Sequence, residues 1–488
     1  MAIAIRRTIP LFLAAALAAG ARGQDAAALM ERLTGASSRL EPDLRVLTDE
    51  IGGRPTGSPA YEAALRWGVD AFRRAGVDDV RIEPYTASAK WQAISASAEV
   101  VEPSRFPVTV VSFALAPSTT PGLTAPLVNG GAGRPEDFEK LGARAKGAIV
   151  LVRTPPMNSF EDLFAEYLAG PAMMNAAVAH GAAALLVCST RPRDLLYRHS
   201  ITWGAIAPIA MGQVRREDGL RLARLLDAGK ALRMRLDLRN ETGGPWQAAN
   251  VVAEIRGSEL PEEIVLLGAH LDSWDLGTGA LDNGVNCALV VDVARAIAAG
   301  PRPKRTIRFA LFTGEEIGLL GSRGYVHNHR AEMPQFVAVL IHDIGDGKIT
   351  GYYTNGRPEL DAPLKAILAS AGPGADGAND EAILGTDNFD FLLEGVPNLV
   401  ADQQTERYLA DYHAESDTYD KVDFALARRN AAIAAVAVVG IANAPSRLGP
   451  RQSRAEVERV LEQNKLDAQM KTYDLWSDWE SGKRGREK

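Results

Sequence analysis

Short apolar runs alternate with amphipathic stretches from about residue 249 onward. Residues 264–267, 306–312 and 336–341 are short and apolar, as buried strands are. Residues 285–298 and the stretch beyond residue 316 follow them with helical spacing. Alternating strands and helices predict an α/β fold, in which a mostly parallel mixed sheet carries helices on both faces.

Flanking segments extend this pattern at both ends. Residues 59–75 have apolar positions at helical spacing, Gly76 follows as a C-cap, and a strand is expected near residues 80–85. Later, residues 386–394 predict a helix and 396–401 another strand. "RRNAAIAAVAVVGIANA" predicts a helix of small residues that packs closely on the sheet.

A block in the middle of the chain has its own strand and helix pattern. The Pro- and Thr-rich stretch near 115–126 marks its start, and "NETGGPW" near residue 245 marks a return to the main pattern. We therefore expect a discontinuous main domain, residues 24–114 and 246–446, around an inserted domain, residues 115–245. This block has no cluster of metal-ligand residues, because His180 and His199 are isolated.

The two ends of the chain differ from the rest. Arg6 and Arg7, an apolar run and small residues near Ala21 predict a signal peptide over residues 1–23, although an uncleaved anchor is the alternative. The mature protein is then expected to be secreted or periplasmic, with no membrane contact. Residues 447–488 predict a charged helical tail that docks on the main domain and frays over its last twelve residues, 477–488.

Composition narrows the class of function. The chain has 46% hydrophobic and 24% charged residues, as a soluble protein with a sizeable core does. Its net charge of −7 argues against nucleic acid as a partner. Two cysteines, Cys188 and Cys287, are too few for a disulfide scaffold, and whether they pair stays open.

Acidic and histidine residues interrupt the apolar pattern directly after successive strands. His270 follows the first strand, Glu315 and Glu316 the second, Asp343 the third, and His413 comes after the strand at 396–401. The carboxyl ends of parallel strands form one rim, where ligands bind. Two imidazoles and several carboxylates there favour a divalent cation, with zinc as the leading candidate.

The number of ligands indicates two zinc ions per chain. One tetrahedral zinc needs fewer protein ligands than the five available, which are His270, Asp282, Glu316, Asp343 and His413. If Asp282 bridges, each metal has three protein ligands and an open position, and the pair can share a hydroxide.

Two further residues have expected roles beside these ligands. Glu315 would be the general base that moves a proton from the metal-bound water to the leaving amine. Asp272 would accept the other ring N–H of His270 and fix its tautomer. A lone Asp at a strand end is more commonly a cap, and a Glu pair commonly starts a solvated helix. Only the joint pattern carries the hypothesis.

The motifs "GAHLDSWDLGTGALDNG", "FTGEEIGLLGS", "HDIGDG" and "YHAESDTYDKVD" resemble those of the di-zinc exopeptidases of metallopeptidase family 28. The resemblance implies that His270, Asp282 and Asp343 hold one zinc. Asp282, Glu316 and His413 would hold the other, with Glu315 as the base. It also implies that the inserted block is a protease-associated domain roofing the cleft, and that "GTDNFDFLLEGVPN" lines the substrate pocket. Many members of the family carry a polar residue two places before the last metal carboxylate, and this chain has Ile341 at that position.

Three functions follow as alternatives. The first is a secreted or periplasmic di-zinc aminopeptidase or dipeptidase that cleaves short peptides with a free N-terminus through a metal-bridging hydroxide and Glu315. The second is a single-zinc enzyme similar to glutaminyl cyclases, and the third is a non-catalytic binding protein on the same scaffold. The complete ligand set favours the first. By analogy with related proteins, we expect a homodimer.

Overall fold

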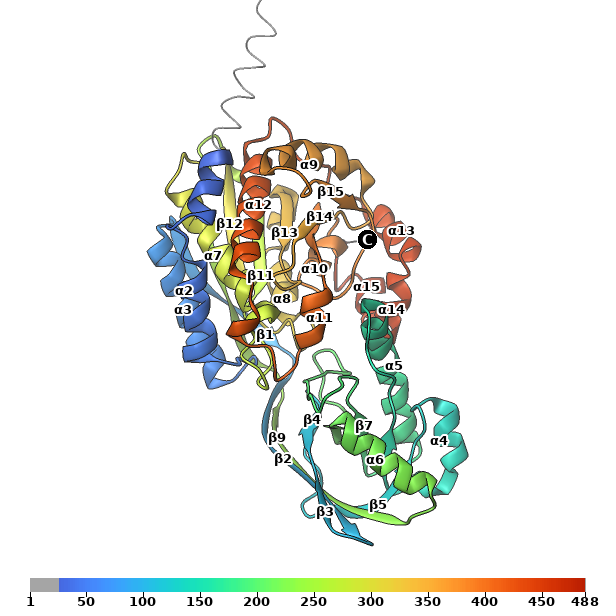
Figure 1. Cartoon of the computed structure of the whole chain (residues 1–488). Helices are drawn as coiled ribbons and strands as arrows, with labels where there is room; N and C mark the ends of the chain where they lie inside the picture. The colour runs from blue at the N-terminus through green and yellow to red at the C-terminus, as the bar shows by residue number, and fades with distance from the viewer. Residues whose placement is uncertain (1–25, 488) are drawn as a thin grey trace, which may run out of the picture.

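The computed structural model describes residues 26–487, and the signal peptide predicted over residues 1–23 lies outside this range. The described chain forms a larger lobe that contains both ends of this range and a smaller lobe below it (Figure 1). Each lobe is built on its own sheet.

The larger lobe contains an eight-stranded mixed sheet. Its four central strands, β12, β11, β13 and β16, are parallel, whereas β1, β10 and β14 pair antiparallel with their inner neighbours. This confirms the predicted mostly parallel mixed sheet. In spatial order the strands are β1 (Asp79–Ala87), β10 (Trp246–Ile255), β12 (Arg305–Phe312), β11 (Leu260–His270), β13 (Phe336–Ile341), β16 (Asn398–Gln403), β14 (Ile349–Tyr353) and β15 (Gly377–Asn379).

Helices cover both faces of this sheet, as the alternating pattern predicts. One face packs against α2 (Leu40–Arg45), α3 (Pro59–Ala75), α7 (Val285–Ala298), α9 (Asp361–Leu368) and α12 (Phe424–Asn443). The other face packs against α8 (Leu320–Asn328) and α10 (Phe389–Leu393). The strands between them are apolar on both faces because neither face meets water.

Local signals set the bounds of α3. The Ser58 hydroxyl accepts a hydrogen bond from the Tyr61 N–H, and Pro59 occupies the first helical position. Gly76 ends the helix in the left-handed region at φ 82°. The predicted range, 59–75, is confirmed.

The small-residue helix α12 lies against the sheet and α7, which confirms its predicted packing. Among the described helices it is the one long and apolar enough to cross a membrane by length and composition. Most of its apolar stretch is buried inside the protein (61%). Its alanines allow close approach of the backbones, so its apolar character belongs to the core.

The smaller lobe contains a second eight-stranded sheet, with three helices: α4 (Pro135–Leu141), α5 (Phe160–Ala179) and α6 (Arg216–Asp227). In spatial order its strands are β3 (Phe106–Val108), β2 (Lys90–Glu102), β9 (Leu232–Gly243), β5 (Thr124–Asn129), β6 (Ile149–Val152), β7 (Ala184–Cys188), β8 (Met211–Val214) and β4 (Val110–Ser112).

This sheet begins at Lys90, before the boundary expected near residue 115. Strand β2 pairs along nearly its full length with β9, and the two strands run out of the larger lobe together (Figure 1). The composition shift at 115–126 therefore lies inside the smaller lobe. The partner of β2 is more than a hundred residues away, so no local signal marked the change of sheet.

The C-terminal segment is helical and docks on the larger lobe, as predicted, but its last residues are ordered rather than frayed. It forms α13 (Arg454–Gln463), α14 (Leu466–Thr472) and α15 (Trp476–Glu480). Trp479 is 1% exposed, and the Arg484 guanidinium donates to both carboxylate oxygens of Asp390 at 2.8 and 2.6 Å. The expectation that residues 477–488 fray is therefore wrong through residue 487, because this charged segment docks an aromatic ring and an ion pair onto α10.

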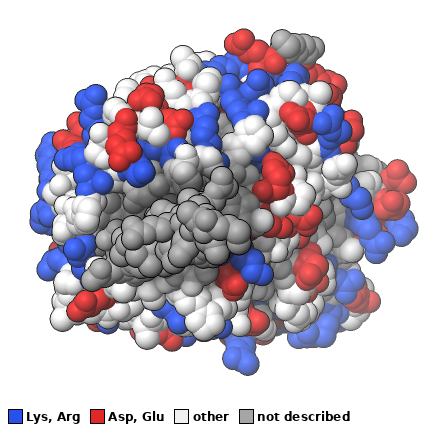
Figure 2. All heavy atoms as spheres, turned by 90° about the horizontal axis from the view of Figure 1, so that it is seen from above, with Lys and Arg blue, Asp and Glu red and all other residues white. Residues whose placement is uncertain are grey.

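Lys and Arg are interspersed with Asp and Glu among the described residues on the face shown in Figure 2. Both buried cysteines, Cys188 and Cys287, are free thiols. They belong to different lobes, since Cys188 ends β7 and Cys287 lies in α7.

Candidate functional site

A cleft of about 590 Å³ opens at the carboxyl ends of the central strands, between the larger lobe and helix α5 of the smaller one. Strand β11 ends at His270, β12 ends just before the Glu315–Glu316 pair, and β13 ends just before Asp343. Residues 264–269, 309–312 and 336–341 of these strands are buried and apolar, so the polar side chains that follow them are placed at one rim.

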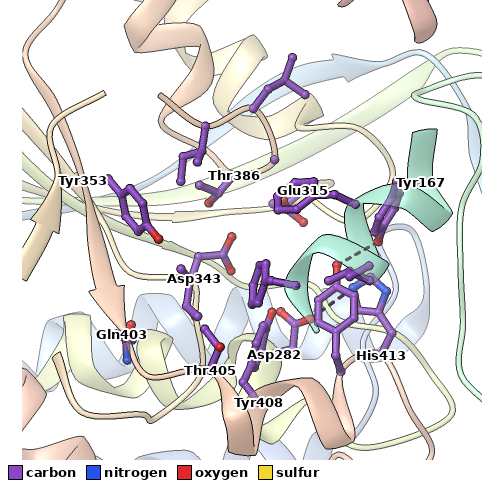
Figure 3. Close-up of a pocket in the computed structure, with 18 of the residues that line it drawn as sticks. Tyr167, Asp282, Glu315, Asp343, Tyr353, Thr386, Gln403, Thr405, Tyr408 and His413 are labelled. Atoms are coloured by element: carbon purple, nitrogen blue, oxygen red, sulfur yellow. Dashed lines mark hydrogen bonds and ion pairs between the residues drawn. The ribbon is translucent and has the colours of Figure 1, made fainter. Parts of the chain in front are cut away.

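The first three-residue group is His270, Asp282 and Asp343. The His270 Nε2 atom lies 2.8 Å from Asp343 Oδ1 and 3.2 Å from Asp282 Oδ1. Figure 3 shows Asp343 and Asp282 bordering the same space as His413. The structure thus brings together residues from the ends of two strands and from the loop before α7.

The second group is Asp282, Glu316 and His413. The His413 Nε2 atom lies 2.9 Å from Glu316 Oε2 and 3.2 Å from Asp282 Oδ2. Asp282 therefore turns one carboxylate oxygen to each histidine. That is the geometry expected of a carboxylate bridging two metal ions.

The donor atoms of these groups fit cations. Asp282 Oδ2 and Asp343 Oδ1 are buried and each faces a histidine ring nitrogen, whereas the buried Glu316 Oε1 atom has no hydrogen-bond donor among the described residues. Buried carboxylate oxygens without donors are costly unless a positive charge faces them. Soft and hard donors together, two imidazole nitrogens and several carboxylates, suit zinc.

The pKa values of the cluster reflect burial and its mixed charges when no cation is bound. Burial raises the pKa of Glu316 to about 7. Burial lowers the pKa of His413, but Glu316 and Asp282 outweigh it and raise that pKa to about 9. Burial would raise the pKa of Asp282, yet His270 and His413 hold it below its ordinary value. A bound cation would displace the protons that these groups share.

Glu315 faces the cleft beside the two groups. Its Oε2 atom lies 4.0 Å from His270 Nε2, farther than the atoms of either group lie from their histidines. Burial raises the pKa of Glu315 well above its ordinary value. Gly314, at φ 70°, makes the turn that separates this side chain from the strand, and a Cβ there would lie 2.7 Å from the Tyr85 hydroxyl.

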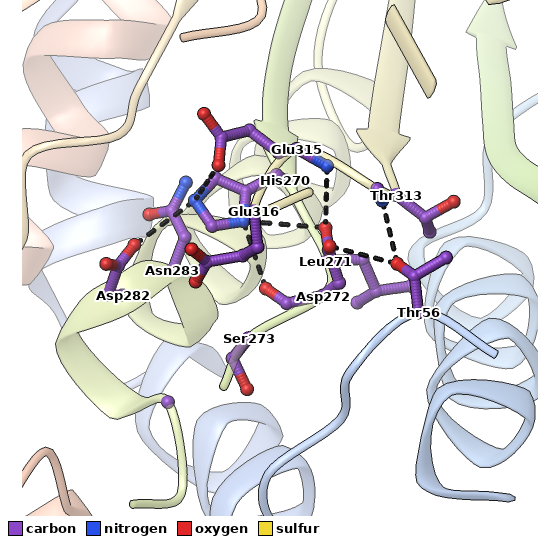
Figure 4. Close-up of polar contacts among 12 residues, drawn as sticks. Thr56, His270, Leu271, Asp272, Ser273, Asp282, Asn283, Thr313, Glu315 and Glu316 are labelled. Carbon is purple, nitrogen blue, oxygen red and sulfur yellow. Dashed lines mark hydrogen bonds and ion pairs between the residues drawn. The ribbon is translucent and has the colours of Figure 1, made fainter. Parts of the chain in front are cut away.

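Asp272 has a different contact from the one predicted. The His270 Nδ1 atom lies 3.0 Å from the main-chain carbonyl oxygen of Asp272 and 3.7 Å from its carboxylate. The carboxylate instead accepts from the Thr56 hydroxyl at 2.9 Å and from the Glu315 N–H at 3.3 Å (Figure 4). The tautomer of His270 is fixed by the main chain, and the Asp272 side chain holds the loop that carries Glu315.

Sequence reasoning missed two buried residues that hold the loop around Asp282. The Arg54 guanidinium donates to the carbonyl oxygens of Leu271, Thr278 and Gly279 at 2.5–2.9 Å. The Asp417 carboxylate accepts from the Leu281 and Asp282 N–H groups at 2.7 and 3.1 Å. Burial raises the pKa of Asp417 to about 7. Asp417 lies in the motif "YHAESDTYDKVD", whereas Arg54 lies outside the four motifs that the sequence analysis quoted.

The smaller lobe also holds His413 directly. The Arg198 N–H donates to the His413 carbonyl oxygen at 2.9 Å, and His413 Nδ1 lies 3.2 Å from the Arg198 carbonyl oxygen. The Arg198 guanidinium in turn makes two 2.9 Å hydrogen bonds to Asp275. With Nδ1–H donated to a carbonyl, the Nε2 lone pair is left for a metal. Neither candidate metal group draws a residue from the inserted block, but Arg198 of this block holds His413 in place.

The walls of the cleft are aromatic and acidic. Helix α5 supplies Phe160, Leu163, Phe164, Tyr167 and Leu168, and the larger lobe supplies Ile344, Tyr353, Ile383, Leu384, Tyr408 and Tyr412, of which Tyr408 lies in α11 (Glu406–Asp411). Beyond the Glu315 cluster, the wall carboxylates are Glu161, Glu381, Asp402 and Glu406. Lys and Arg do not occur among the described residues that line the cleft. Thr386 of the predicted substrate-pocket stretch is in the wall.

Comparisons with known proteins agree with this geometry. The sequence model of Peptidase family M28 matches residues 250–438, a range that contains both histidines and all the carboxylates of the two groups. Carboxypeptidase Q of Xenopus laevis is 28% identical over 391 residues, covering 78% of this chain and 81% of that protein. Aminopeptidase YwaD of Bacillus subtilis is 27% identical over 389 residues, covering 77% and 78%.

The fold is shared as well. The crystal structure of a Peptidase M28 precursor from Shewanella amazonensis superposes with a TM-score of 0.78 at 27% identity, covering 89% of this chain and 99% of that one. The motif "HLDSWD" had also indicated a likeness to carboxypeptidase Q, and the comparison confirms it. In its sequence, its fold and its site, the chain is similar to the proteins of peptidase family M28, and it is a metallopeptidase.

Proposed function

We propose that this protein is a di-zinc aminopeptidase or dipeptidase that hydrolyses short peptides with a free N-terminus. The observation that carries the proposal is the pair of three-residue groups that share Asp282, with Glu315 beside them in an open cleft. His270, Asp282 and Asp343 would hold one zinc, and Asp282, Glu316 and His413 the other.

When bound, two zinc ions would polarise the scissile carbonyl and lower the pKa of the attacking water. Glu315 accepts the proton of that water at its carboxylate. In the second half of the cycle the same carboxyl group returns this proton to the leaving amine. Asp272 keeps the Glu315 main chain in place through the hydrogen bond at 3.3 Å.

The charge of the cleft supports recognition of the amino end of a peptide. An ammonium group pairs with carboxylates, and the wall offers four beyond the Glu315 cluster. A terminal carboxylate is ordinarily bound by Arg or Lys, and the described lining has neither. Carboxypeptidase Q is among the similar proteins, but the residues that line the cleft favour aminopeptidase or dipeptidase action. The similar protein YwaD is named an aminopeptidase, which also supports this choice.

The size of the cleft supports short substrates. A volume of about 590 Å³ lies in the range of small-molecule pockets, and helix α5 closes one side of it. We assign residues 90–243, which include nearly all of the block predicted at 115–245, to an inserted protease-associated domain that roofs this cleft.

We also propose that residues 1–23 are a signal peptide and that the mature enzyme is secreted or periplasmic. A similar protein from Mycobacterium tuberculosis is named a probable lipoprotein aminopeptidase, which supports export. The homodimer remains a proposal by analogy with related proteins.

The test combines a metal count with turnover on matched peptides. We expect about two zinc ions per chain, loss of activity with a strong chelator, and cleavage of dipeptides with free but not acetylated N-termini. One zinc per fully loaded chain, with conversion of N-terminal glutamine peptides to cyclised products, would establish the cyclase alternative instead. Cleavage of only the acetylated peptides would show that the enzyme does not recognise a free N-terminus, which contradicts the proposal.

A further inference from the structure

The C-terminal segment reaches the active-site cleft. Gln469, in α14, and Tyr473, directly after it, line the same cavity as the metal-binding groups. Both lie outside the part of the chain that matches the family model, residues 250–438. Helix α14 also contacts α5, and the two helices lie side by side in Figure 1. This segment therefore supplies a wall that residues 250–438 do not provide by themselves.

Tyr473 joins this wall to the smaller lobe. Its ring stacks on Trp203, with the ring centroids 4.7 Å apart and the planes at 19°. Trp203 belongs to the loop before β8 and also lines the cleft. A stacked pair of this kind presents a flat apolar surface, and it contributes beyond the area that it buries.

The loop that carries Trp203 is fixed beside the catalytic glutamates. The Gly204 N–H donates to the Ile317 carbonyl oxygen at 2.7 Å, and the Ser88 hydroxyl donates to the Gly204 carbonyl oxygen at 2.6 Å. A Cβ at Gly318, which has φ 117°, would lie only 3.0 Å from the Trp203 backbone. The indole position is thus tied to the segment that directly follows the Glu315–Glu316 pair.

The C-terminal segment itself is anchored firmly. Trp479 and Met470 are buried in one apolar cluster with Leu319, which lines the cleft from the larger lobe. The Arg484–Asp390 ion pair closes the far end of the segment. A side chain anchored in this way can discriminate between substrates by shape, because it cannot move aside at low cost.

Apolar side chains of α5 that line the same cavity indicate what this wall accepts. Phe164 and Leu168 lie one turn apart on α5 and are 39% and 40% exposed, although both are large and apolar. They line the same cavity as Tyr473 and Trp203. Burying such surface against a ligand contributes roughly 25 cal/mol per Å². A bulky apolar group of a bound peptide would cover it, whereas a glycine would leave it exposed to water.

We propose that Tyr473, stacked on Trp203, is a specificity-determining residue of this peptidase. The stacked pair forms one wall of a subsite for a large apolar side chain of the peptide, and Phe164 and Leu168 of the same cavity complete the apolar lining. The inference rests on the proposed function, because it takes the substrate to be a short peptide.

The test measures kcat/KM on two dipeptide series with free N-termini, Xaa-Ala and Ala-Xaa, where Xaa is Gly, Ala, Leu or Phe. In one of the series, Tyr473→Ala should lower the preference for Leu and Phe over Gly by roughly 10-fold or more, mainly through KM. Trp203→Ala should shift the same ratio, and the double variant should add little to either single change. Tyr473→Phe keeps the ring and should restore the wild-type ratio.

Trp476→Ala is the matched control, because this aromatic residue belongs to the same segment but does not line the cleft. It should keep the wild-type ratio, and the zinc content of all variants should be equal. An equal fall for every substrate, or an unchanged ratio in both Tyr473→Ala and Trp203→Ala, would overturn the proposal.

Binding provides a second measurement that does not depend on turnover. In a Glu315→Gln background, calorimetry should show that Tyr473→Ala weakens binding of the Phe dipeptide but not of the Gly dipeptide. Equal weakening of both would also overturn the subsite. If the wild-type enzyme cleaved only peptides with a blocked N-terminus, the proposed function would be wrong. The preference for Leu and Phe over Gly, measured on those blocked peptides, would still test the subsite formed by Tyr473 and Trp203.

Discussion

The two adjacent glutamates provide the sharpest test of the site, because they are identical in chemistry and differ only in position. Glu316 Oε2 lies 2.9 Å from His413 Nε2, within one of the two metal-binding groups. Glu315 Oε2 lies 4.0 Å from His270 Nε2 and belongs to neither group. Replacing each by Gln keeps the size of the side chain and removes the carboxylate.

Glu315→Gln should keep both zinc ions and lose the proton acceptor. A lost general base ordinarily costs roughly 10²–10⁴-fold in rate. At 1.36 kcal/mol per tenfold, this is about 3–5 kcal/mol of transition-state stabilisation. The loss should appear in kcat, with KM changed little, because substrate binding does not use this carboxylate.

Glu316→Gln should instead remove a ligand. The second zinc should be lost or loosened, by more than the 10–100-fold typical when only a partner of a ligand is changed. Added zinc should restore part of the activity of this variant and none of the activity of Glu315→Gln.

The assay is zinc content by elemental analysis after gel filtration, beside kcat and KM on one dipeptide with a free N-terminus. The wild-type enzyme prepared in parallel is the control for metal loading. Loss of a metal from Glu315→Gln, with both metals kept in Glu316→Gln, would show that the two roles are reversed. Wild-type turnover in both variants would refute the catalytic interpretation of the cleft.

Three further predictions concern the residues around the site and the fold. Arg198→Met should weaken zinc binding by roughly 10–100-fold in a chelator competition, because the segment that orients His413 loses its ion pair; unchanged affinity would show that the main-chain contacts suffice. Arg484→Met should lower the free energy of unfolding in urea by about 3–5 kcal/mol, since Asp390 stays buried without a partner; a change below 1 kcal/mol would contradict this. Burial lowers the pKa of His329, but Glu83 and Glu332 contact its ring and outweigh burial, so that the pKa is raised. The charged His329 therefore stabilises the fold fully below about pH 6.5, and this stabilisation is lost as the pH rises through the raised pKa. His329→Gln should therefore destabilise the protein more at pH 5.5 than at pH 9, and an equal effect at both would refute the linkage.

Much of the larger lobe could be predicted from the sequence because its signals are local. The ranges of α3, α7 and β13 agree with the residues predicted for them, since caps and apolar periodicity act within a few residues. The five residues of the two candidate metal groups, and Glu315 beside them, could also be found, because each directly follows a strand or stands in a recognisable motif. Their convergence follows from the parallel order of the strands.

Contacts between distant segments were decided only by the tertiary structure. Strand β2 joins the smaller lobe because its partner β9 follows more than a hundred residues later, and no composition change marks Lys90. Arg54 gives no local signal of its own, yet it is buried where three carbonyl groups of the Asp282 loop converge. Arg198 orients His413 from the inserted block through main-chain atoms, which are the same in every residue.

The C-terminal segment shows the same division. Its sequence predicts a charged helix that docks and then frays over residues 477–488, whereas in the fold the segment places Tyr473 in the cleft and Trp479 in the core. The sequence by itself determined which residues could bind a metal, because that depends on side-chain chemistry. Only the folded chain decided which segments surround them, because packing depends on surfaces that meet after the chain has brought distant residues together.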